Sequence, residues 1–181
     1  MYKDHVFHFV SVIVPCYNEE KFIGACLDSI VANGYPSDQM EVMVIDGISQ
    51  DRTREIVGHY VKRYPFIRLV DNPKKILASA WNLGIRSGRG DIIMALNAHG
   101  SYRPGYIANC VKHLDEYEAD YAGGIIITRP RNQAFMDDAV ATVLSHPFGV
   151  GNSYFRIGLE KADWAYTAAF GGYRRELFEK T

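Results

Sequence analysis

Apolar runs and helical patterns alternate along the chain. Runs made mostly of apolar residues, typical of strands buried on both faces, cover residues 10–15, 41–45 and 92–96, and a short third strand is predicted over residues 67–70. Between these runs, apolar residues recur at the three- and four-residue spacing of an amphipathic helix, over residues 22–31, 56–64 and 76–87. This alternation predicts an α/β fold with a mostly parallel central sheet and helices on both faces, joined by right-handed crossovers.

The pattern loosens in the second half of the chain. A helix is predicted from Pro104 to about Tyr117, a strand over Ala122–Thr128 and a further helix over Gln133–Leu144. Residues 146–169 are rich in Gly, Tyr and Phe without a period, which predicts a long irregular loop suited to binding. The segment from Arg174 reads as the start of a helix without a stop signal. We therefore expect the chain to be the C-terminally truncated part of a longer protein.

The composition is that of one soluble globular domain. Of its 181 residues, 48% are hydrophobic and 23% are charged, and the formal net charge is -1, which gives no basic surface for nucleic acid. The three cysteines are widely spaced, match neither a disulfide framework nor a zinc motif, and indicate a reducing compartment. No apolar run approaches the roughly 20 residues of a membrane span, and no signal peptide is evident. We expect a cytoplasmic protein.

Polar side chains follow three of the predicted strands at their carboxyl ends. Glu19 follows the first strand, Asp46 the second, and Asn97 and His99 the fourth. Because the carboxyl ends of parallel strands meet along one edge, where ligands bind in open α/β sheets, we expect one cleft. Tyr17, in the first of these turns, can stack on a base or simply pack against its neighbours. The turn of Asn97 and His99 can also serve only its own backbone amides.

The usual glycine-rich phosphate cradles are missing. Neither Gly-x-Gly-x-x-Gly nor Gly-Lys-Ser/Thr follows the first strand, which opposes a dinucleotide-dependent oxidoreductase and a P-loop enzyme. If phosphate is bound, a divalent metal is the natural group to hold it. Arg174 and Arg175 stand at a helix entrance and form either a solvated face or a clamp on a diphosphate. Cys16 is expected to be a small buried thiol rather than a nucleophile.

Four motifs, in chain order, resemble glycosyltransferase family two, whose members have the GT-A fold (the nucleotide-diphospho-sugar transferase fold). Val12–Glu20 looks like the opening signature of that family, and Asp46–Thr53 resembles its second-strand motif. Asn72–Gly84 resembles the next block, and Asn97-Ala98-His99 falls on the Asp-x-Asp metal motif. The resemblance covers essentially the whole chain. It implies a single domain, with a nucleotide-sugar-binding part over residues 1–130 and the start of an acceptor-side part over 131–181.

The resemblance implies an inverting glycosyltransferase. A hexose would pass from a nucleotide-diphosphate sugar, with UDP as the expected nucleotide, to a polysaccharide or lipid-linked saccharide acceptor. Residues 146–152 and 170–175, together with His99, resemble the bacterial exopolysaccharide glucosyltransferases of the succinoglycan type. Membrane association, at the inner face of the plasma membrane, would come only through sequence outside these residues.

The same resemblance implies roles for individual residues. It assigns nucleotide binding to residues of the three turns: Pro15, Tyr17, Glu19, Asp46 and Asn97. It places Mg²⁺ or Mn²⁺ on Asn97 and His99, and it places Arg174 and Arg175 on the diphosphate or acceptor side.

Two departures from the family pattern matter. Asn97 replaces the leading aspartate, and its neutral amide oxygen is a weaker ligand for a hard cation, while His99 favours a softer metal. The catalytic base of the family is a carboxylate downstream of the Arg-Arg segment, which would lie beyond Thr181. We therefore expect the 181 residues to be inactive alone. The alternative is a degenerate, non-catalytic module that binds nucleotide or a partner, and Asn97 favours it.

Overall fold

The computed structural model describes residues 8–128, 135–151, 153–158, 161–165 and 169–179. Its packing separates the chain into two compact units. The first unit comprises residues 1–122 and 172–181, and the second comprises residues 123–171. The predicted functional boundary at residue 130 falls outside the described residues. The two units are described separately below.

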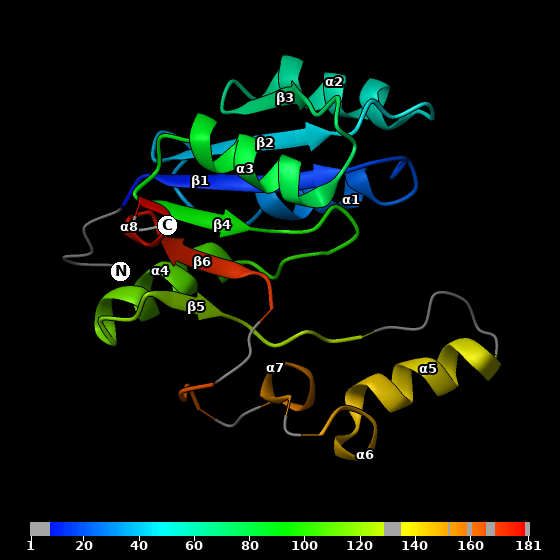
Figure 1. Cartoon of the computed structure of the whole chain (residues 1–181), viewed down its shortest axis with the longest axis vertical. Coiled ribbons are helices and arrows are strands. Elements are labelled where there is room, and N and C mark those ends of the chain that lie inside the picture. The colour runs from blue at the N-terminus through cyan, green and yellow to red at the C-terminus, as the bar shows by residue number, and fades with distance from the viewer. Residues whose placement is uncertain (1–7, 129–134, 152, 159–160, 166–168, 180–181) are drawn as a thin grey trace. The chain divides into compact units, whose positions relative to one another are not determined.

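A six-stranded sheet organises the first unit, with the strand order β3-β2-β1-β4-β6-β5 (Figure 1). The strands are β1 Val10–Cys16, β2 Met40–Asp46, β3 Ile67–Asp71, β4 Ile92–Ala95, β5 Tyr121–Gly123 and β6 Gly171–Arg174. β1 pairs in parallel with both β2 and β4, β2 pairs in parallel with β3, and β6 runs antiparallel to β4. The prediction of a mostly parallel sheet is confirmed.

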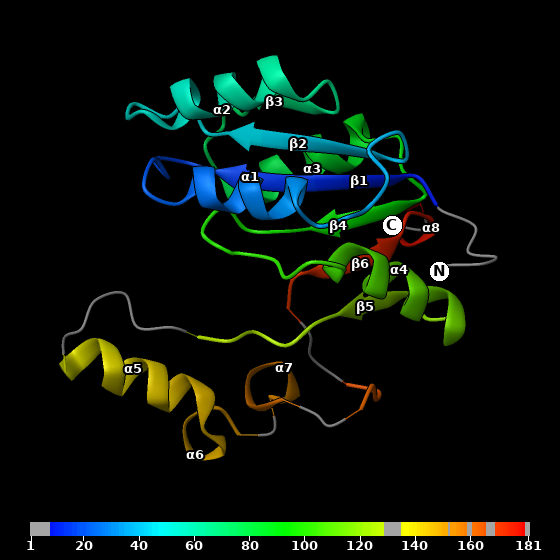
Figure 2. The same cartoon turned by 180° about the vertical axis from the view of Figure 1, so that it is seen from behind.

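Helices cover both faces of this sheet. They are α1 Ile23–Val31, α2 Thr53–Arg63, α3 Leu77–Ser87, α4 Tyr106–Glu116 and the short α8 Glu176–Glu179. α3 lies on the face toward the viewer in Figure 1, and α1 and α4 lie on the opposite face, which Figure 2 shows. Under α3, the fully buried Ile13, Met43 and Ile93 form a core cluster with Ala80 of the helix. Continuous apolar strands are therefore buried on both faces, as their sequences require.

Two elements near the chain's second half differ from the sequence prediction. The strand expected over residues 122–128 is limited to β5, because Gly123 and Gly124 weaken a strand: they are conformationally free and have no side chain to pack. Ile125 and Ile127 are then more than half exposed. Arg174 belongs to β6 rather than to a helix, because Tyr173 pairs with Ile93 of β4 and its ring packs on that of Tyr121. The helix starts at Glu176.

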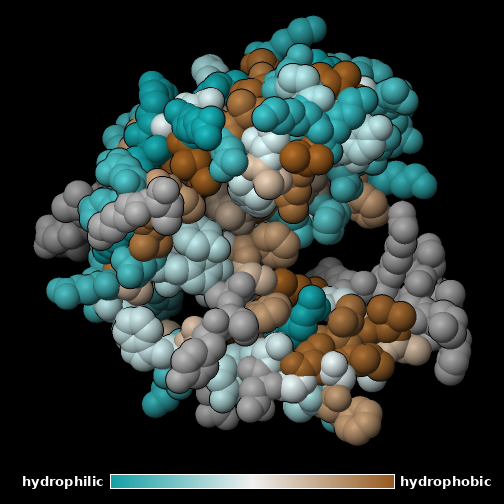
Figure 3. Space-filling view, viewed as in Figure 1, coloured by the Kyte–Doolittle hydropathy of each residue, from teal (hydrophilic) through white to brown (hydrophobic). Residues whose placement is uncertain are grey.

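The second unit contains α5 Phe135–Ser145, α6 Pro147–Val150 and α7 Tyr154–Ile157. The irregular loop expected over residues 146–169 is thus interrupted by two short helices. The His146 side chain caps α6 by accepting a hydrogen bond from the Phe148 amide, with Pro147 at the first helical position. Val140 and Val143 of α5 are half exposed, and with Ala139 and Leu144 they line a shallow apolar hollow on this helix. Hydrophobic residues gather on the surface in the region of α5 in Figure 3. No helix in the described residues is both long and apolar enough to cross a membrane.

Gly84 tests how tightly α3 packs on the sheet. A Cβ atom at this position would lie 2.5–2.8 Å from three side-chain atoms of Ile13, whereas a Cβ at Gly58, inside α2, would meet nothing within 4 Å. We expect Gly84→Ala to lower the free energy of unfolding by about 1–3 kcal/mol through overpacking. Gly58→Ala should raise it by up to about 1 kcal/mol through helix propensity. Urea denaturation of both variants measures the difference, and equal effects would contradict this packing.

Candidate functional site

The turns after β1, β2 and β4 lie along the carboxyl edge of the parallel strands. Tyr17 and Glu19 follow β1, Asp46 ends β2, and Asn97 follows β4. The end of β1 is level with the end of β2, because Cys16 pairs with Asp46 in register. Pro15 is the last residue but one of β1 and is half-buried. The structure thus brings these predicted nucleotide-binding residues to one edge, as the sequence pattern indicates.

Hydrogen bonds between side chains and amides join the first two turns. Ser49 Oγ accepts from the Asn18 amide at 2.9 Å, and Asn18 Oδ1 accepts from the Gln50 amide at 2.9 Å. Thr53 Oγ1 accepts from the Glu19 amide at 2.7 Å. These hydrogen bonds accompany φ values of 54° at Asn18 and 60° at Ile48. Both values lie in the left-handed region, which a β-branched residue such as Ile48 rarely adopts. The two turns are therefore joined directly by hydrogen bonds.

The carboxylate of Asp46 is completely buried beneath these turns. Its Oδ2 accepts from the Ser49 amide at 3.0 Å and pairs with Arg54 Nη1 at 2.5 Å. Its Oδ1 accepts from Ser49 Oγ at 2.5 Å. Arg54 also pairs with Asp71 at 2.8 Å, and the hydrogen bonds that its guanidinium donates to both carboxylates raise the pKa of Arg54. In this structure Asp46 has no surface to offer a ligand and instead shapes the turn.

Cys16 lies against the same carboxylate. Its Sγ is 3.6 Å from Asp46 Oδ1. Burial, and then the negative charge of Asp46, raise the pKa of the Cys16 thiol far above its ordinary value. The thiol is therefore neutral and unreactive at physiological pH, which agrees with the expectation that it is not a nucleophile.

Tyr17 offers an open aromatic surface at the edge. Its side chain is 46% exposed, and one side of it lies against Gly47, where a Cβ would come within 3.1 Å of the ring. Lys75 Nζ lies 5.8 Å from the ring centroid, within cation–π distance. Lys75 has a φ of 56° in a turn that hydrogen bonds back to Asn72. The sequence prediction missed Lys75, since a lysine after an Asn-Pro turn is usually only a solvated charge.

Tyr102 holds Asn97 in place. The Asn97 amide N–H donates to Tyr102 Oη at 2.8 Å, and the same oxygen lies 3.3 Å from Asn97 Oδ1. Cys26 Sγ donates to the Asn97 carbonyl at 3.3 Å. Burial raises the pKa of Tyr102 well above its ordinary range, so the phenol keeps its proton and remains a donor. Sequence analysis missed Tyr102, because its role depends on the chain folding back within five residues.

The predicted metal ligands are adjacent and accessible. His99 is 60% exposed, its Nε2 lies 3.3 Å from Asn97 Nδ2, and its Nδ1 lies 3.5 Å from Glu19 Oε1. The oxygen and nitrogen of a side-chain amide can exchange places by a 180° rotation of the amide group. This rotation in Asn97 would bring Oδ1 beside His99 Nε2. Two ligand atoms at about this spacing can share one cation with bonds of about 2.1 Å. The pair therefore fits a divalent ion whose other ligands come from substrate oxygens and water.

Protein ligands alone do not make a closed metal site at this edge. Within the described residues, no three His, Cys, Asp or Glu side chains converge as a metal-binding group. Both Asn97 and His99 can bind as neutral ligands, so their joint affinity for a hard cation is weak without an anionic substrate. That Asn97 weakens metal binding stays a prediction.

The structure places Arg174 and Arg175 away from this edge. Arg174 pairs in register with Ile92, at the amino end of β4, and its guanidinium donates to the carbonyls of Leu114 and Ala119. Arg175 donates to the carbonyls of Ile85, Gly88 and Gly90, beyond the end of α3. Neither arginine forms the expected diphosphate clamp in this structure, because both guanidinium groups donate to backbone carbonyls near helix ends.

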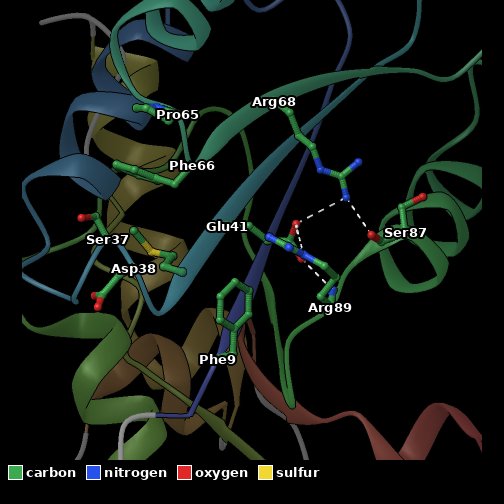
Figure 4. Close-up of a pocket in the computed structure, with 10 residues that line it drawn as sticks. Phe9, Ser37, Asp38, Glu41, Pro65, Phe66, Arg68, Ser87 and Arg89 are labelled. Atoms are coloured by element: carbon green, nitrogen blue, oxygen red, sulfur yellow. Dashed lines mark hydrogen bonds and ion pairs between the residues drawn. The ribbon is translucent and has the colours of Figure 1, made fainter.

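A separate hollow of about 590 Å³ lies at the amino edge of the sheet (Figure 4). Its centre is the nearly buried Glu41, whose Oε1 accepts from Ser11 Oγ at 2.8 Å and from the Arg89 amide at 2.6 Å. Arg68 and Arg89 approach the other carboxylate oxygen at 3.5 and 3.7 Å. These groups satisfy one another and join β1, β2 and β3 to the turn before β4. We interpret this hollow as structural.

Comparisons with known proteins identify the family to which this fold belongs. The model of a family described as Glycosyl transferase family 2 matches residues 11–181. The chain belongs to this family. Family 2 relatives include a dolichyl N-acetyl-α-D-glucosaminyl phosphate 3-β-D-2,3-diacetamido-2,3-dideoxy-β-D-glucuronosyltransferase of Methanococcus voltae, 26% identical over 96% of this chain and 55% of that protein. The succinoglycan biosynthesis protein ExoA of Rhizobium meliloti is 28% identical over 93% of this chain and 50% of its own.

A solved structure gives the same fold. A mannosyltransferase from Pyrobaculum calidifontis, in complex with GDP-Man and Mn²⁺, superposes with a TM-score of 0.70 and 26% identity. The match covers 97% of this chain and 47% of that one. The GT-A fold predicted from the sequence is confirmed. The chain spans about half the length of the relatives that it matches.

The Asp46–Arg54 pair can be tested by removing the cation. We expect Arg54→Gln to lower the free energy of unfolding by about 1–3 kcal/mol, because Asp46 stays buried with its charge less compensated. Arg52, two residues earlier, pairs with Glu55 while 70% exposed. Arg52→Gln is the matched control and should change stability by less than about 0.5 kcal/mol. Urea denaturation midpoints compare the two, and a smaller loss for Arg54→Gln would contradict the role assigned to Asp46.

Proposed function

We propose that the chain is the donor-binding part of an inverting glycosyltransferase. It would move a hexose from a nucleotide-diphosphate sugar to a saccharide or lipid-linked saccharide in cell-surface polysaccharide synthesis. The observation that carries this proposal is the open Tyr17 ring beside Lys75, on the same edge as Asn97 and His99. The succinoglycan relative supports a polysaccharide product, and the dolichyl phosphate relative supports a lipid-linked acceptor.

Each side chain then has a task that follows from its placement. The Tyr17 ring stacks on the base, and Lys75 supplies positive charge near the diphosphate. Asp46, buried and paired with Arg54, keeps the two turns in position. Asn97 and His99 hold a divalent ion, as the Mn²⁺ in the Pyrobaculum complex supports, and that ion would neutralise charge on the departing diphosphate.

The reaction needs one further group. An acceptor hydroxyl oxygen forms a bond to the anomeric carbon while the bond from that carbon to the diphosphate oxygen breaks, and a base takes the hydroxyl proton. We propose that this base is a carboxylate outside the 181 residues. A non-catalytic nucleotide-binding module is the second candidate, and the neutral Asn97 at the metal turn favours it. Sugar transfer by a longer chain that includes the downstream carboxylate would exclude this second candidate.

Tyr17 tests whether the edge binds nucleotide. Calorimetric titration of the chain with UDP and GDP, each with Mn²⁺, should give measurable binding, and Tyr17→Leu should weaken it by about 1–3 kcal/mol, the range of a base–aromatic stack. Tyr117, at the end of α4, is equally exposed at 46%. Tyr117→Leu is therefore the control and should bind like the original chain. No binding of either nucleotide, or equal loss in both variants, would overturn the proposal.

Asn97 tests the metal turn. We expect Asn97→Asp to strengthen Mn²⁺-dependent UDP binding by about 1–3 kcal/mol, because a carboxylate adds a charged ligand. Gln39 precedes β2 at the opposite edge of the sheet, so Gln39→Glu adds the same charge there and should have no effect. Transfer should remain absent in both variants, for want of the base. Unchanged affinity in Asn97→Asp would show that position 97 is not a metal ligand, and transfer would place a base within residues 1–181.

A further inference from the structure

Asn72 is a buried polar residue at the carboxyl edge to which the proposed function gives no task. It follows Asp71, the last residue of β3, and only 3% of its surface is exposed. Its amide N–H donates to the Asp46 carbonyl at 2.7 Å, which ties it to the end of β2. Because a buried polar side chain is costly unless its atoms find partners, the contacts of the Asn72 side chain indicate what it is there to do.

The side chain of Asn72 closes the turn that leads from β3 into α3. Its Nδ2 donates to the Ile76 carbonyl at 3.0 Å, and the Lys75 amide donates to the Asn72 carbonyl at 3.0 Å. Its Oδ1 is buried and has no hydrogen-bond partner in the described part of the chain. Exchanging the two amide atoms would set an oxygen against the Ile76 carbonyl, so this contact fixes Nδ2 as the donor. The side chain therefore satisfies the turn and leaves its own oxygen unsatisfied.

This turn holds Lys75 in an unusual backbone conformation. Its φ of 56° lies in the left-handed region, which is unfavourable for a residue other than glycine. Lys75 is exposed, so packing does not hold it there, and the hydrogen bonds on either side of it remain as the constraint. In this conformation its Nζ lies 5.8 Å from the centroid of the Tyr17 ring. A return of Lys75 to an ordinary negative φ would redirect its side chain and carry the ammonium away from the ring.

We infer that Asn72 is a positioning residue that holds Lys75 beside Tyr17, where its ammonium meets the diphosphate of a nucleotide stacked on that ring. The inference rests on the proposed function for its ligand, and it involves no metal ion. Asn72 acts through Lys75 rather than by touching the nucleotide. Loss of Asn72 and loss of Lys75 should therefore remove the same interaction, so that their effects on nucleotide binding do not add.

The first test observes the turn without any ligand. The ring of Tyr17 should shift the ε-methylene protons of Lys75 upfield, in ¹H–¹³C spectra of ¹³C-lysine-labelled chain assigned with Lys75→Arg. Asn72→Ala should lose most of this shift, as should Asn72→Asp, which keeps the shape of the side chain and removes the donor. Asn109→Ala, at an exposed position of α4, is the control and should keep it. The original shift in either folded Asn72 variant would overturn the inference.

The second test is a double-mutant cycle on UDP affinity, measured by calorimetry at one fixed Mn²⁺ concentration. Lys75→Ala should weaken UDP binding about 10- to 100-fold, the range of a hydrogen bond to a charged group, and Asn72→Ala should weaken it by a similar factor. The double variant should bind no more than about twofold more weakly than Lys75→Ala alone. Lys74→Ala removes the same charge from the adjacent exposed position and should bind UDP like the original chain.

The outcomes of this cycle separate the two proposals. Losses that multiply in the double variant, or a loss in Asn72→Ala without one in Lys75→Ala, would show that Asn72 acts independently of Lys75 and would overturn the inference. No UDP binding by the original chain would defeat the proposed function. Normal binding by the original chain, with unchanged affinity in Asn72→Ala, would defeat only this inference.

Discussion

The buried Asp46 carboxylate is the constraint on which the carboxyl edge depends. A charge with no solvent contact requires compensation from the protein, and Ser49 and Arg54 supply it. Ser49 is also the residue that accepts from the Asn18 amide, so the same group that satisfies Asp46 also fixes the turn after β1. Compensation of one buried charge thereby sets the positions of two neighbouring turns. The positions of these turns are thus fixed by contacts within the protein, and such preorganisation lowers the entropic cost of binding a ligand.

The Asp46–Arg54 pair also bears on how an edge that contains acidic residues could accept the anionic ligand proposed for it. A free carboxylate at position 46 would repel a diphosphate, but Arg54 offsets its charge, and Arg54 is itself shared with Asp71. Lys75, held over the Tyr17 ring, adds positive charge at the surface. The proposed nucleotide diphosphate would therefore meet an edge at which the charge of Asp46 is offset and an aromatic surface is open, even though the chain as a whole carries a net charge of -1.

Local pattern was sufficient to predict the sheet, because strands buried on both faces are rich in apolar residues and β1, β2 and β4 are such runs, while β3 is a shorter and more exposed strand. It also placed Tyr17, Glu19, Asp46 and Asn97 at one edge. It could not predict β6, whose four residues become a strand only by pairing with β4 from far along the chain. For the same reason the tasks of Arg174 and Arg175 were missed. Their bonds go to backbone carbonyls about 55–90 residues away, which no local pattern records.

The neutral Asn97 alters the electrostatics of the metal turn rather than only weakening it. Two carboxylates would cancel most of the charge of a divalent ion, whereas an amide and an imidazole leave that charge intact for the diphosphate. The ion would then depend on the substrate for its binding, so that metal and nucleotide bind together or hardly at all. Under the proposed function, such a site would trade metal affinity in the empty state for charge at the moment the diphosphate is bound.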